Sequence, residues 1–279
     1  MDKDIIRISS DLKQYLSFLF IKAGILPWFL GIALITFTVA SDNFLTAANI
    51  VGVARHSTDL ILVAMAQMIV MLTAGLDFSV GAILAMTSVV ASMTMVALWS
   101  GYGSGWEAII IGCLAGLLVG ACIGLVNGVG VAFFRVPPFI MTLGMSSIIF
   151  GLALTITGGI PVYGAPESFT NIVGYGSLLG IPISIWITLF CILLIYIFIN
   201  LTKMGRYFYA IGGNLRAAEL SGINTKLYIV SAYVFSALVT SIAALLITAR
   251  LETGEPNIGA NYPLLSIAAC AIGGVSLLG

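Results

Sequence analysis

Long apolar runs separated by short polar segments dominate the chain. A helix needs roughly 20 apolar residues to cross the hydrocarbon core of a bilayer. Runs of about this length lie near residues 24–41, 51–74, 80–99, 107–131, 138–157, 182–201, 227–250 and 262–279. Lipid offers no hydrogen bonds to the backbone, so each run is predicted to be a helix. The pattern predicts an all-α, polytopic transmembrane helix bundle of about eight spans.

Composition supports a membrane protein. Of the 279 residues, 60% are hydrophobic and only 8% are charged, whereas about 25% of residues in a soluble domain are charged. We expect one transmembrane domain over residues 1–279 and, because the net charge is zero, no nucleic acid partner. The four cysteines lie in apolar runs without C-x-x-C spacing and there is one histidine, so no disulfide or metal site is expected.

Positive charges predict the orientation. Residues 1–23 are interpreted as a cytoplasmic lead-in, because no small-x-small cleavage site closely follows the apolar run that begins after Lys22. With the N-terminus inside, only Arg55 and Arg250 lie outside. The cytoplasmic Lys and Arg are then Lys3, Arg7, Lys13, Lys22, Arg135, Lys203, Arg206, Arg216 and Lys226. Because cytoplasmic loops carry the excess of Lys and Arg, the N-terminus and residues 202–226 are predicted to be cytoplasmic.

Glycines recur every four residues in the fourth predicted span. They are Gly112, Gly116, Gly120, Gly124 and Gly128. Glycine lets helix backbones approach closely in lipid, so this helix is expected to pack inside the bundle. A direct role in transport is the alternative.

A short charged segment, GRYFYAIGGNLRAAELSGI (Gly205–Ile223), separates two predicted spans. Asn214 is a suitable N-cap and Gly222 a suitable C′ residue for a helix of about two turns over LRAAELS. Gly205, Gly212 and Gly213 would permit sharp turns before it. So short a helix needs a surface to rest on. It is interpreted as a cytoplasmic knob that docks into another protein, with Arg206, Arg216, Ala217, Ala218, Glu219 and Ser221 as further candidate contacts. The alternatives are a helix on the headgroups and a plain loop.

Few other charges lie near the spans. Asp77 and Ser79 are candidates for a gate or for a structural cap of the third span. Arg55 and Asp59 can pair four residues apart; they and the Arg250–Glu252 cluster are either interfacial groups or contacts for an external partner. The Gly- and Pro-rich loop over residues 157–180 is either a docking or gating surface or a connector. No substrate site is assigned to the polar residues Gln67, Thr73, Asn127 and Thr142.

Four stretches in this order resemble one family. They are TAGLDFSVGA (Thr73–Ala82), the block Asn127–Gly159 that contains RVPPFIMTLG, the segment Gly205–Ile223, and IGGVSLLG (Ile272–Gly279). They resemble the motifs G-G-I-D-L-S-V-G, R-x-P-P-F-I-x-T-L-G, A-I-G-G-N-x-x-A-A-x-L-S-G-I and I-G-G-x-S-L-x-G-G of the permease subunits of bacterial sugar ABC importers. The branch includes the ribose, xylose, galactofuranose and autoinducer-2 systems. Ala74 and Phe78 are mild departures from the first motif.

The resemblance implies a partnership in the inner membrane. Two permeases, identical or different, would form the path, and a soluble binding protein would deliver a monosaccharide or similar polyol-like molecule for inward transport. A separate ATPase would use ATP and Mg²⁺ and grip residues 202–226 as a coupling segment, while this chain binds no cofactor. Family members usually have about ten spans, so the sequence is expected to be truncated after Gly279.

Other functions remain as alternatives. The chain lacks H-E-x-x-H, G-x-S-x-G and the phosphate loop G-x-x-x-x-G-K-[ST], so it is expected to be neither an enzyme nor the ATPase. A non-transporting scaffold or assembly fragment is one alternative, and an ion-coupled secondary transporter is another. Uptake that requires ATP rather than the membrane potential would separate the importer from the secondary transporter.

Overall fold

The computed structural model describes residues 26–99 and 105–276. It contains two compact units, Met1–Val53 and Ala54–Gly279. The predicted lead-in, residues 1–23, lies outside the described residues, as does the end of the last predicted span.

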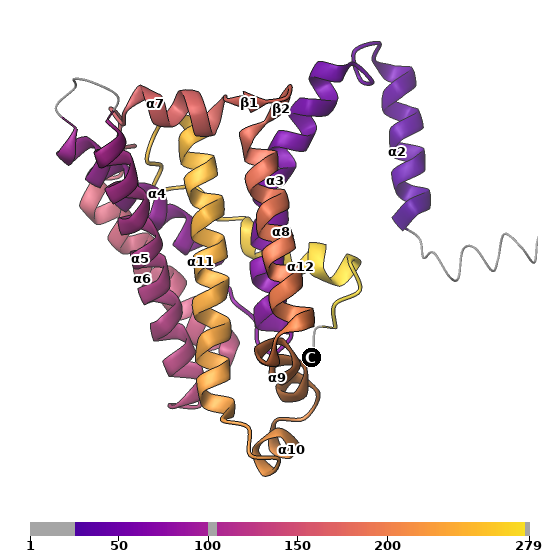
Figure 1. The fold of residues 1–279 in the computed structure, drawn as a ribbon, viewed down its shortest axis with the longest axis vertical. Coiled ribbons are helices and arrows are strands. Elements are labelled where there is room, and N and C mark those ends of the chain that lie inside the picture. The colour runs from indigo at the N-terminus through magenta and orange to yellow at the C-terminus, as the bar shows by residue number, and fades with distance from the viewer. Residues whose placement is uncertain (1–25, 100–104, 277–279) are drawn as a thin grey trace, which may run out of the picture. The chain divides into compact units, whose positions relative to one another are not determined.

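Helices make up most of the described chain (Figure 1). In order they are α2 (Leu26–Ala40), α3 (Ala47–Met71), α4 (Val80–Leu98), α5 (Trp106–Ala132), α6 (Pro138–Thr157), α7 (Glu167–Phe169), the π-helix η1 (Thr170–Gly174), α8 (Ile183–Leu201), α9 (Lys203–Gly213), α10 (Leu215–Leu220), α11 (Thr225–Leu251) and α12 (Tyr262–Ile272). Two short antiparallel strands, β1 (Ser177–Leu178) and β2 (Ile181–Pro182), precede α8. The predicted all-α polytopic fold is confirmed.

Six of these helices, α3, α4, α5, α6, α8 and α11, are long and apolar enough to cross a membrane. The other two predicted spans form shorter apolar helices: α2 has 15 residues and α12 has 11. In α12 the helix ends where Gly273 and Gly274 break the apolar run, and Gly274 has a φ of +89°. Both of these predicted spans, 24–41 and 262–279, extend into residues that the structure does not describe.

Helix α11 lies at the centre of the second unit, against α4 and α5. Its buried positions include Tyr233, Ala237, Ser241, Ala244 and Thr248. Small residues at helix contacts allow close approach in lipid, where side-chain hydrophobicity gives no drive for association. The core of the unit is therefore built around small residues of α4, α5 and α11.

The glycine series of α5 divides between these two neighbours. Gly112 and Gly116 face α4, where a Cβ on Gly112 would lie 2.8 Å from the carbonyl oxygen of Ala91. Gly120, Gly124 and Gly128 face α11, where a Cβ on Gly124 would lie 2.6 Å from the carbonyl oxygen of Tyr233. The four-residue spacing thus lets one helix contact two neighbours closely along its length.

The structure corrects the expected turns before LRAAELS, because Gly205 and Gly213 belong to the helix α9. A Cβ on Gly205 would overlap the carbonyl group of Ile199. Phe208 is fully buried, with its ring centroid 5.9 Å from that of Phe198. Tertiary packing of this side therefore stabilises a helix in a stretch whose glycines predicted a loop. Helix α8 ends instead at Thr202, which has extended backbone between α8 and α9 and whose side-chain oxygen accepts from the Gly205 N–H at 3.3 Å.

Candidate functional site

Both ends of α10 are stabilised by its own sequence. The side-chain oxygen of Asn214 accepts from the Ala217 N–H at 2.9 Å, which caps the helix as predicted. At the other end, Gly222 has a φ of +81°. The N–H groups of Gly222 and Ile223 donate to the carbonyl oxygens of Glu219 and Ala218 at 3.0 and 3.1 Å. This pair of bonds is a Schellman motif, so a helix of six residues has a defined start and end.

One face of α10 packs on the chain and the rest is open. Ala218 is 4% exposed, whereas Ala217 is exposed and Leu220 is 85% exposed. The Glu219 carboxylate accepts from the Thr225 hydroxyl at 3.1 Å, which joins α10 to the first residue of α11. The expectation that Ala218 offers close approach to a partner is therefore wrong, because this chain already covers it. Ala217 is the alanine available to a partner.

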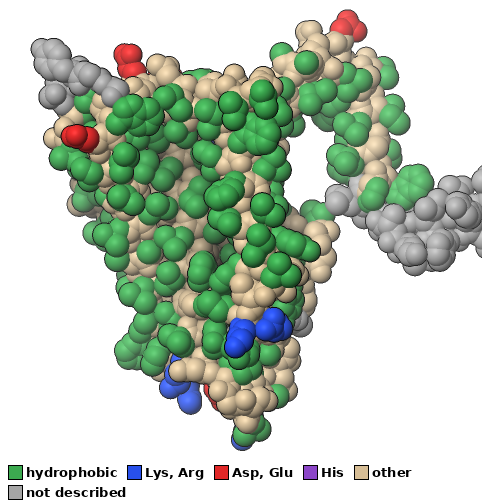
Figure 2. Space-filling model, in the orientation of Figure 1, with side chains coloured by type: hydrophobic (Ala, Val, Ile, Leu, Met, Phe, Trp, Pro, Cys, Tyr) green, Lys and Arg blue, Asp and Glu red, His purple; other side chains and the backbone are tan. Residues whose placement is uncertain are grey.

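A cavity of about 850 Å³ lies beside α10, which we call the basic hollow. Its lining includes Leu215, Arg216, Glu219 and Leu220 of α10, and Thr73, Ala74, Arg135, Pro138 and Lys226 from other parts of the chain. Figure 2 shows Lys and Arg side chains gathered at the end of the molecule where α9 and α10 lie. Three cations against one anion give the hollow a positive character, with apolar walls between the charges.

The loop between α3 and α4, residues 72–79, forms a buried polar centre. Asp77 and Ser79 are both fully buried. Asp77 Oδ1 accepts from the Ser79 N–H at 2.8 Å and from the Ser79 hydroxyl at 2.6 Å, and Asn127 Nδ2 donates to Ser79 Oγ at 2.8 Å. Ser79 is the N-cap residue of α4, but its side chain makes no capping hydrogen bond. The structure therefore places Asp77 and Ser79 in an interhelical network that includes α5.

Other helices hold the same loop. The Gln67 amide of α3 can pair with both backbone groups of Asp77: Nε2 donates to the carbonyl oxygen at 3.0 Å and Oε1 accepts from the N–H at 3.1 Å. On α6, Thr142 Oγ1 accepts from the Phe78 N–H at 3.0 Å, donates to the Pro138 carbonyl oxygen at 2.9 Å and lies 3.3 Å from the Leu76 carbonyl oxygen. The Tyr233 hydroxyl of α11 lies 3.5 Å from the same carbonyl oxygen. Four membrane-spanning helices thus fix one loop whose first residues, Thr73 and Ala74, border the basic hollow.

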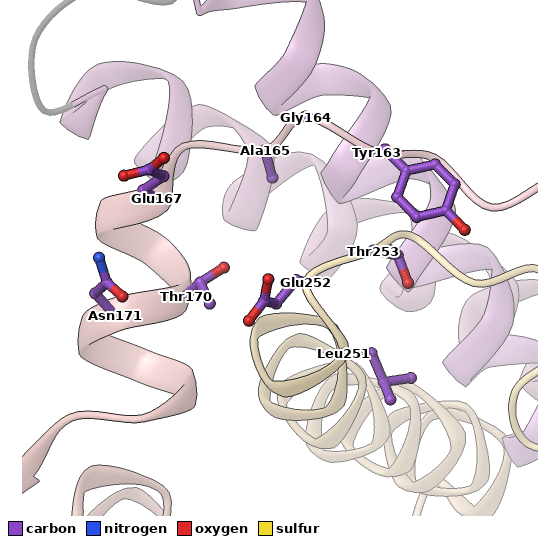
Figure 3. A pocket seen from close by; sticks show the side chains of 9 residues that line it. All are labelled: Tyr163, Gly164, Ala165, Glu167, Thr170, Asn171, Leu251, Glu252 and Thr253. Carbon is purple, nitrogen blue, oxygen red and sulfur yellow. The ribbon is translucent and has the colours of Figure 1, made fainter.

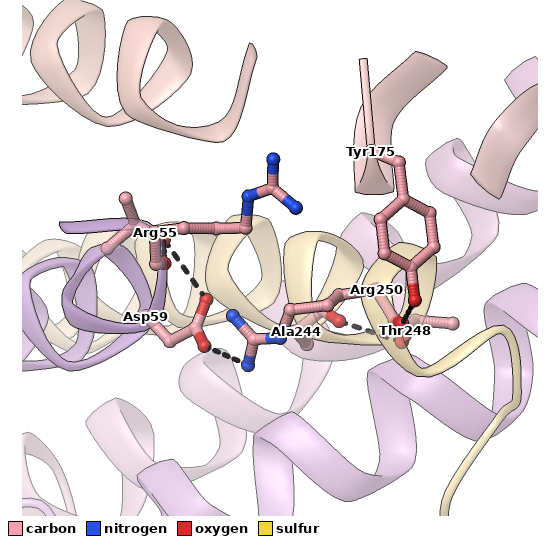
Figure 4. Close-up of polar contacts among 7 residues, drawn as sticks. Arg55, Asp59, Tyr175, Ala244, Thr248 and Arg250 are labelled. Atoms are coloured by element: carbon pink, nitrogen blue, oxygen red, sulfur yellow. Dashed lines mark hydrogen bonds and ion pairs between the residues drawn. The ribbon is translucent and has the colours of Figure 1, made fainter. Parts of the chain in front are cut away.

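The charged residues at the other end of α11 form a different arrangement from the expected one. Asp59, which is 1% exposed, is paired with Arg250 of α11, and the predicted pair with Arg55 is wrong (Figure 4). The Tyr175 hydroxyl donates to the Arg250 carbonyl oxygen at 3.0 Å, and the Arg55 guanidinium lies 5.9 Å from the Tyr175 ring centroid. Two clusters that are far apart in the sequence are therefore one, and its buried carboxylate cannot contact an external partner in this conformation.

Glu252 lies in an open pocket of about 470 Å³ near this cluster (Figure 3). Tyr163, Glu167, Thr170 and Asn171 from the long loop line the other side. That loop is attached to the helices: Val162 and Gly254 exchange two backbone hydrogen bonds of 2.8 Å, and Phe169 is 2% exposed. The loop is therefore packed on the helices, while side chains such as that of Tyr163 remain exposed.

The sequence did not predict the buried polar centre around residues 72–79. Gln67, Asn127 and Thr142 stand out as polar residues in apolar runs, but periodicity did not show that all three converge on one loop. Tyr233 gave no signal, because an aromatic residue in a span is ordinary. Asn127 and Thr142 do lie in the stretches that resemble family motifs, and this was the available clue.

The six long apolar helices and the charge distribution define a multi-pass membrane protein. A family model described as branched-chain amino acid transport system / permease component matches residues 49–279. The chain therefore belongs to this permease family, whose members are transport subunits and not enzymes.

Curated relatives have sugar permease names. The D-allose transport system permease protein of Escherichia coli K12 is 34% identical over 242 residues, which are 87% of this chain and 72% of the relative. The ribose import permease protein of Bacillus subtilis 168 is 35% identical over 254 residues, or 90% and 76% of the two chains. The L-arabinose ABC transporter permease protein of Azospirillum brasilense is 33% identical over 258 residues, or 92% and 73%. No solved structure matches the chain.

Proposed function

We propose that this chain is the permease subunit of a binding-protein-dependent ABC importer that carries a small sugar inward across the inner membrane. Relatives named for D-allose, ribose and L-arabinose transport support a monosaccharide substrate. In this proposal a second permease completes the path, a soluble binding protein delivers the sugar, and ATP with Mg²⁺ is used by a separate ATPase. The N-terminus is cytoplasmic, as the distribution of Lys and Arg favours.

The observation that carries the proposal is the exposed face of α10. A six-residue helix with defined caps projects from the end where Lys and Arg gather, and its Leu220 is 85% exposed. Exposed apolar patches with a polar rim are typical of protein interaction sites. The residues 202–226 thus serve as the coupling segment, with Ala217 and Leu220 against the ATPase.

The basic hollow supports an electrostatic part of the same contact. The Arg135 and Arg216 side chains make no hydrogen bond or ion pair with any residue that the structure describes. Complementary charge at an interface speeds association and fixes register more than it adds affinity. An acidic side chain of the ATPase is the group that would fit between them.

The test is co-purification with a candidate ATPase subunit of a sugar ABC importer, using Ala217→Trp. Because Ala217 is exposed, the ring should leave the fold intact and clash with the docked ATPase. We expect more than about a tenfold loss of bound ATPase, which corresponds to a clash of over about 1.4 kcal/mol. Ala97→Trp is the matched control. Ala97 is also exposed, but it lies at the C-terminal end of α4 and not on α10, so this variant should bind the ATPase normally.

Uptake measurements separate the other functions. The importer requires ATP and stops in Ala217→Trp while the membrane potential is intact. Uptake that follows the potential would support an ion-coupled transporter instead. A stable complex that never moves sugar would support a scaffold, and equal ATPase binding by both tryptophan variants would refute docking at α10.

A further inference from the structure

The Asp77–Ser79–Asn127 network has too few hydrogen-bond donors if Asp77 is ionised. Asp77 Oδ1 receives both donors of Ser79, its N–H and its hydroxyl. Asp77 Oδ2 and Asn127 Oδ1 are buried and have no hydrogen-bond partner among the described residues. A carboxylate and an amide oxygen are acceptors only, so these two atoms cannot satisfy each other without a proton. Buried polar atoms of this kind are normally paired.

No cation of the described residues forms an ion pair with Asp77. Within the described ranges, the ion pair is that of Asp59 with Arg250, and the side chains from other elements that hydrogen-bond to the loop are those of Gln67, Asn127, Thr142 and Tyr233. None of these side chains carries a positive charge. Burial raises the pKa of the Asp77 carboxyl, and the hydrogen bonds from Ser79 oppose this only in part. A buried carboxyl without a cation generally becomes neutral rather than remaining charged.

One feature favours the ionised form, namely the N-terminus of α4. Its partial positive charge stabilises a nearby anion. However, the Asp77 carboxylate accepts from Ser79, which precedes the helix, and from no N–H group of the first turn. The effect of the helix dipole is therefore smaller than the desolvation of a fully buried carboxylate.

We propose that Asp77 binds a proton and, as a neutral acid, donates from Oδ2 to Asn127 Oδ1. The proton supplies the one donor that the network lacks and joins α5 to the loop that precedes α4. The two unpartnered atoms belong to groups whose other polar atom contacts the same Ser79 hydroxyl, at 2.6 Å for Asp77 Oδ1 and 2.8 Å for Asn127 Nδ2. Asp77 is then a positioning residue: it holds the loop whose start borders the basic hollow, and it need not touch the transported molecule.

Infrared spectroscopy of the purified permease tests the proton directly and does not depend on the proposed function. The native-minus-Asp77→Asn difference spectrum should contain the C=O stretch of a protonated carboxyl at neutral pH. The control is Asp59→Asn, whose difference spectrum should contain only carboxylate bands, because Asp59 is paired with Arg250. Asn127→Leu should shift the Asp77 band by removing the acceptor. Carboxylate bands in the Asp77 difference spectrum would overturn the proposal.

A substitution series gives a second test, in which uptake rests on the proposed function and the yield of folded protein does not. An asparagine has the shape of a neutral aspartic acid and keeps both an acceptor and a donor. Asp77→Asn should therefore fold and retain uptake within about twofold, whereas Asp77→Ala should lose about tenfold or more in folded yield or uptake. If Asp77→Asn is as damaged as Asp77→Ala, Asp77 must be ionised and the proposal fails.

Discussion

Two aspartates are buried near opposite ends of α11, and they are stabilised differently. Asp59 is 1% exposed and paired with the Arg250 guanidinium. Asp77 is fully buried and has hydrogen bonds from Ser79 but no cation within the described part of the chain. The first belongs to a spanning helix, α3, and the second to the loop that follows it.

The difference shows two ways to bury a carboxyl group in an apolar protein. A cation from a distant element can compensate the charge, which makes the two partners depend on each other. Alternatively the charge can be removed, which leaves a network of neutral hydrogen bonds that each helix must complete. The same residue type should therefore respond to substitution in opposite ways at the two sites.

Removing the cation from Asp59 should give the largest effect. Arg250→Met keeps the apolar stem but leaves the Asp59 carboxylate buried without compensation. We expect a loss of about 3 to 5 kcal/mol in the free energy of unfolding, measured in mixed micelles with denaturant.

The double variant Asp59→Leu/Arg250→Met is the control, because it removes both charges. It should regain most of the lost stability, within about 1 kcal/mol of the native chain. A double variant no more stable than Arg250→Met would mean that Arg250 acts through its other contacts, such as the Tyr175 hydroxyl on its carbonyl oxygen.

The two sites also differ in how far the sequence predicts them. Apolar run length predicted α4, α5, α6, α8 and α11 to within two residues at each end, because lipid requires long continuous helices. Capping residues predicted both ends of α10, since those bonds are local. The helix α9 was missed, because the burial of Phe208 against α8 and α11 is tertiary and outweighs the preference of its glycines.

The hydrogen bonds and ion pairs between helices could not be predicted from the sequence. The spacing of Arg55 and Asp59 favours a local pair, yet Asp59 binds an arginine 191 positions away. Likewise, Asn127 and Thr142 meet the loop after α3 only once the bundle has formed. Helix periodicity identifies which face is apolar but not which helix it meets.

An intermediate effect is expected for Gln67 at the Asp77 site. Gln67→Met keeps the size of the side chain and removes both bonds to the backbone of Asp77. Because a buried N–H and a buried carbonyl then lose their partners, the free energy of unfolding should fall by about 2 to 4 kcal/mol. Thr94→Val is the control: Thr94 bonds only a carbonyl oxygen of its own helix, at 2.7 Å, so it should change little. Equal effects of the two substitutions would argue against the Gln67 contact.

The smallest effects should come from two tyrosines, one beside each aspartate site, whose hydroxyl groups contact a backbone carbonyl oxygen. Tyr175→Phe removes a 3.0 Å hydrogen bond to the Arg250 carbonyl oxygen, but the ring is 50% exposed and water can replace the donor. Tyr233→Phe removes a contact of 3.5 Å to the Leu76 carbonyl oxygen, and a hydrogen bond of this length is weak. We expect each change to cost at most about 1 kcal/mol in the free energy of unfolding. A much larger loss for Tyr233→Phe would mean that its hydroxyl serves the Asp77 network as more than a weak donor to Leu76, and the neutral network would then need a further member.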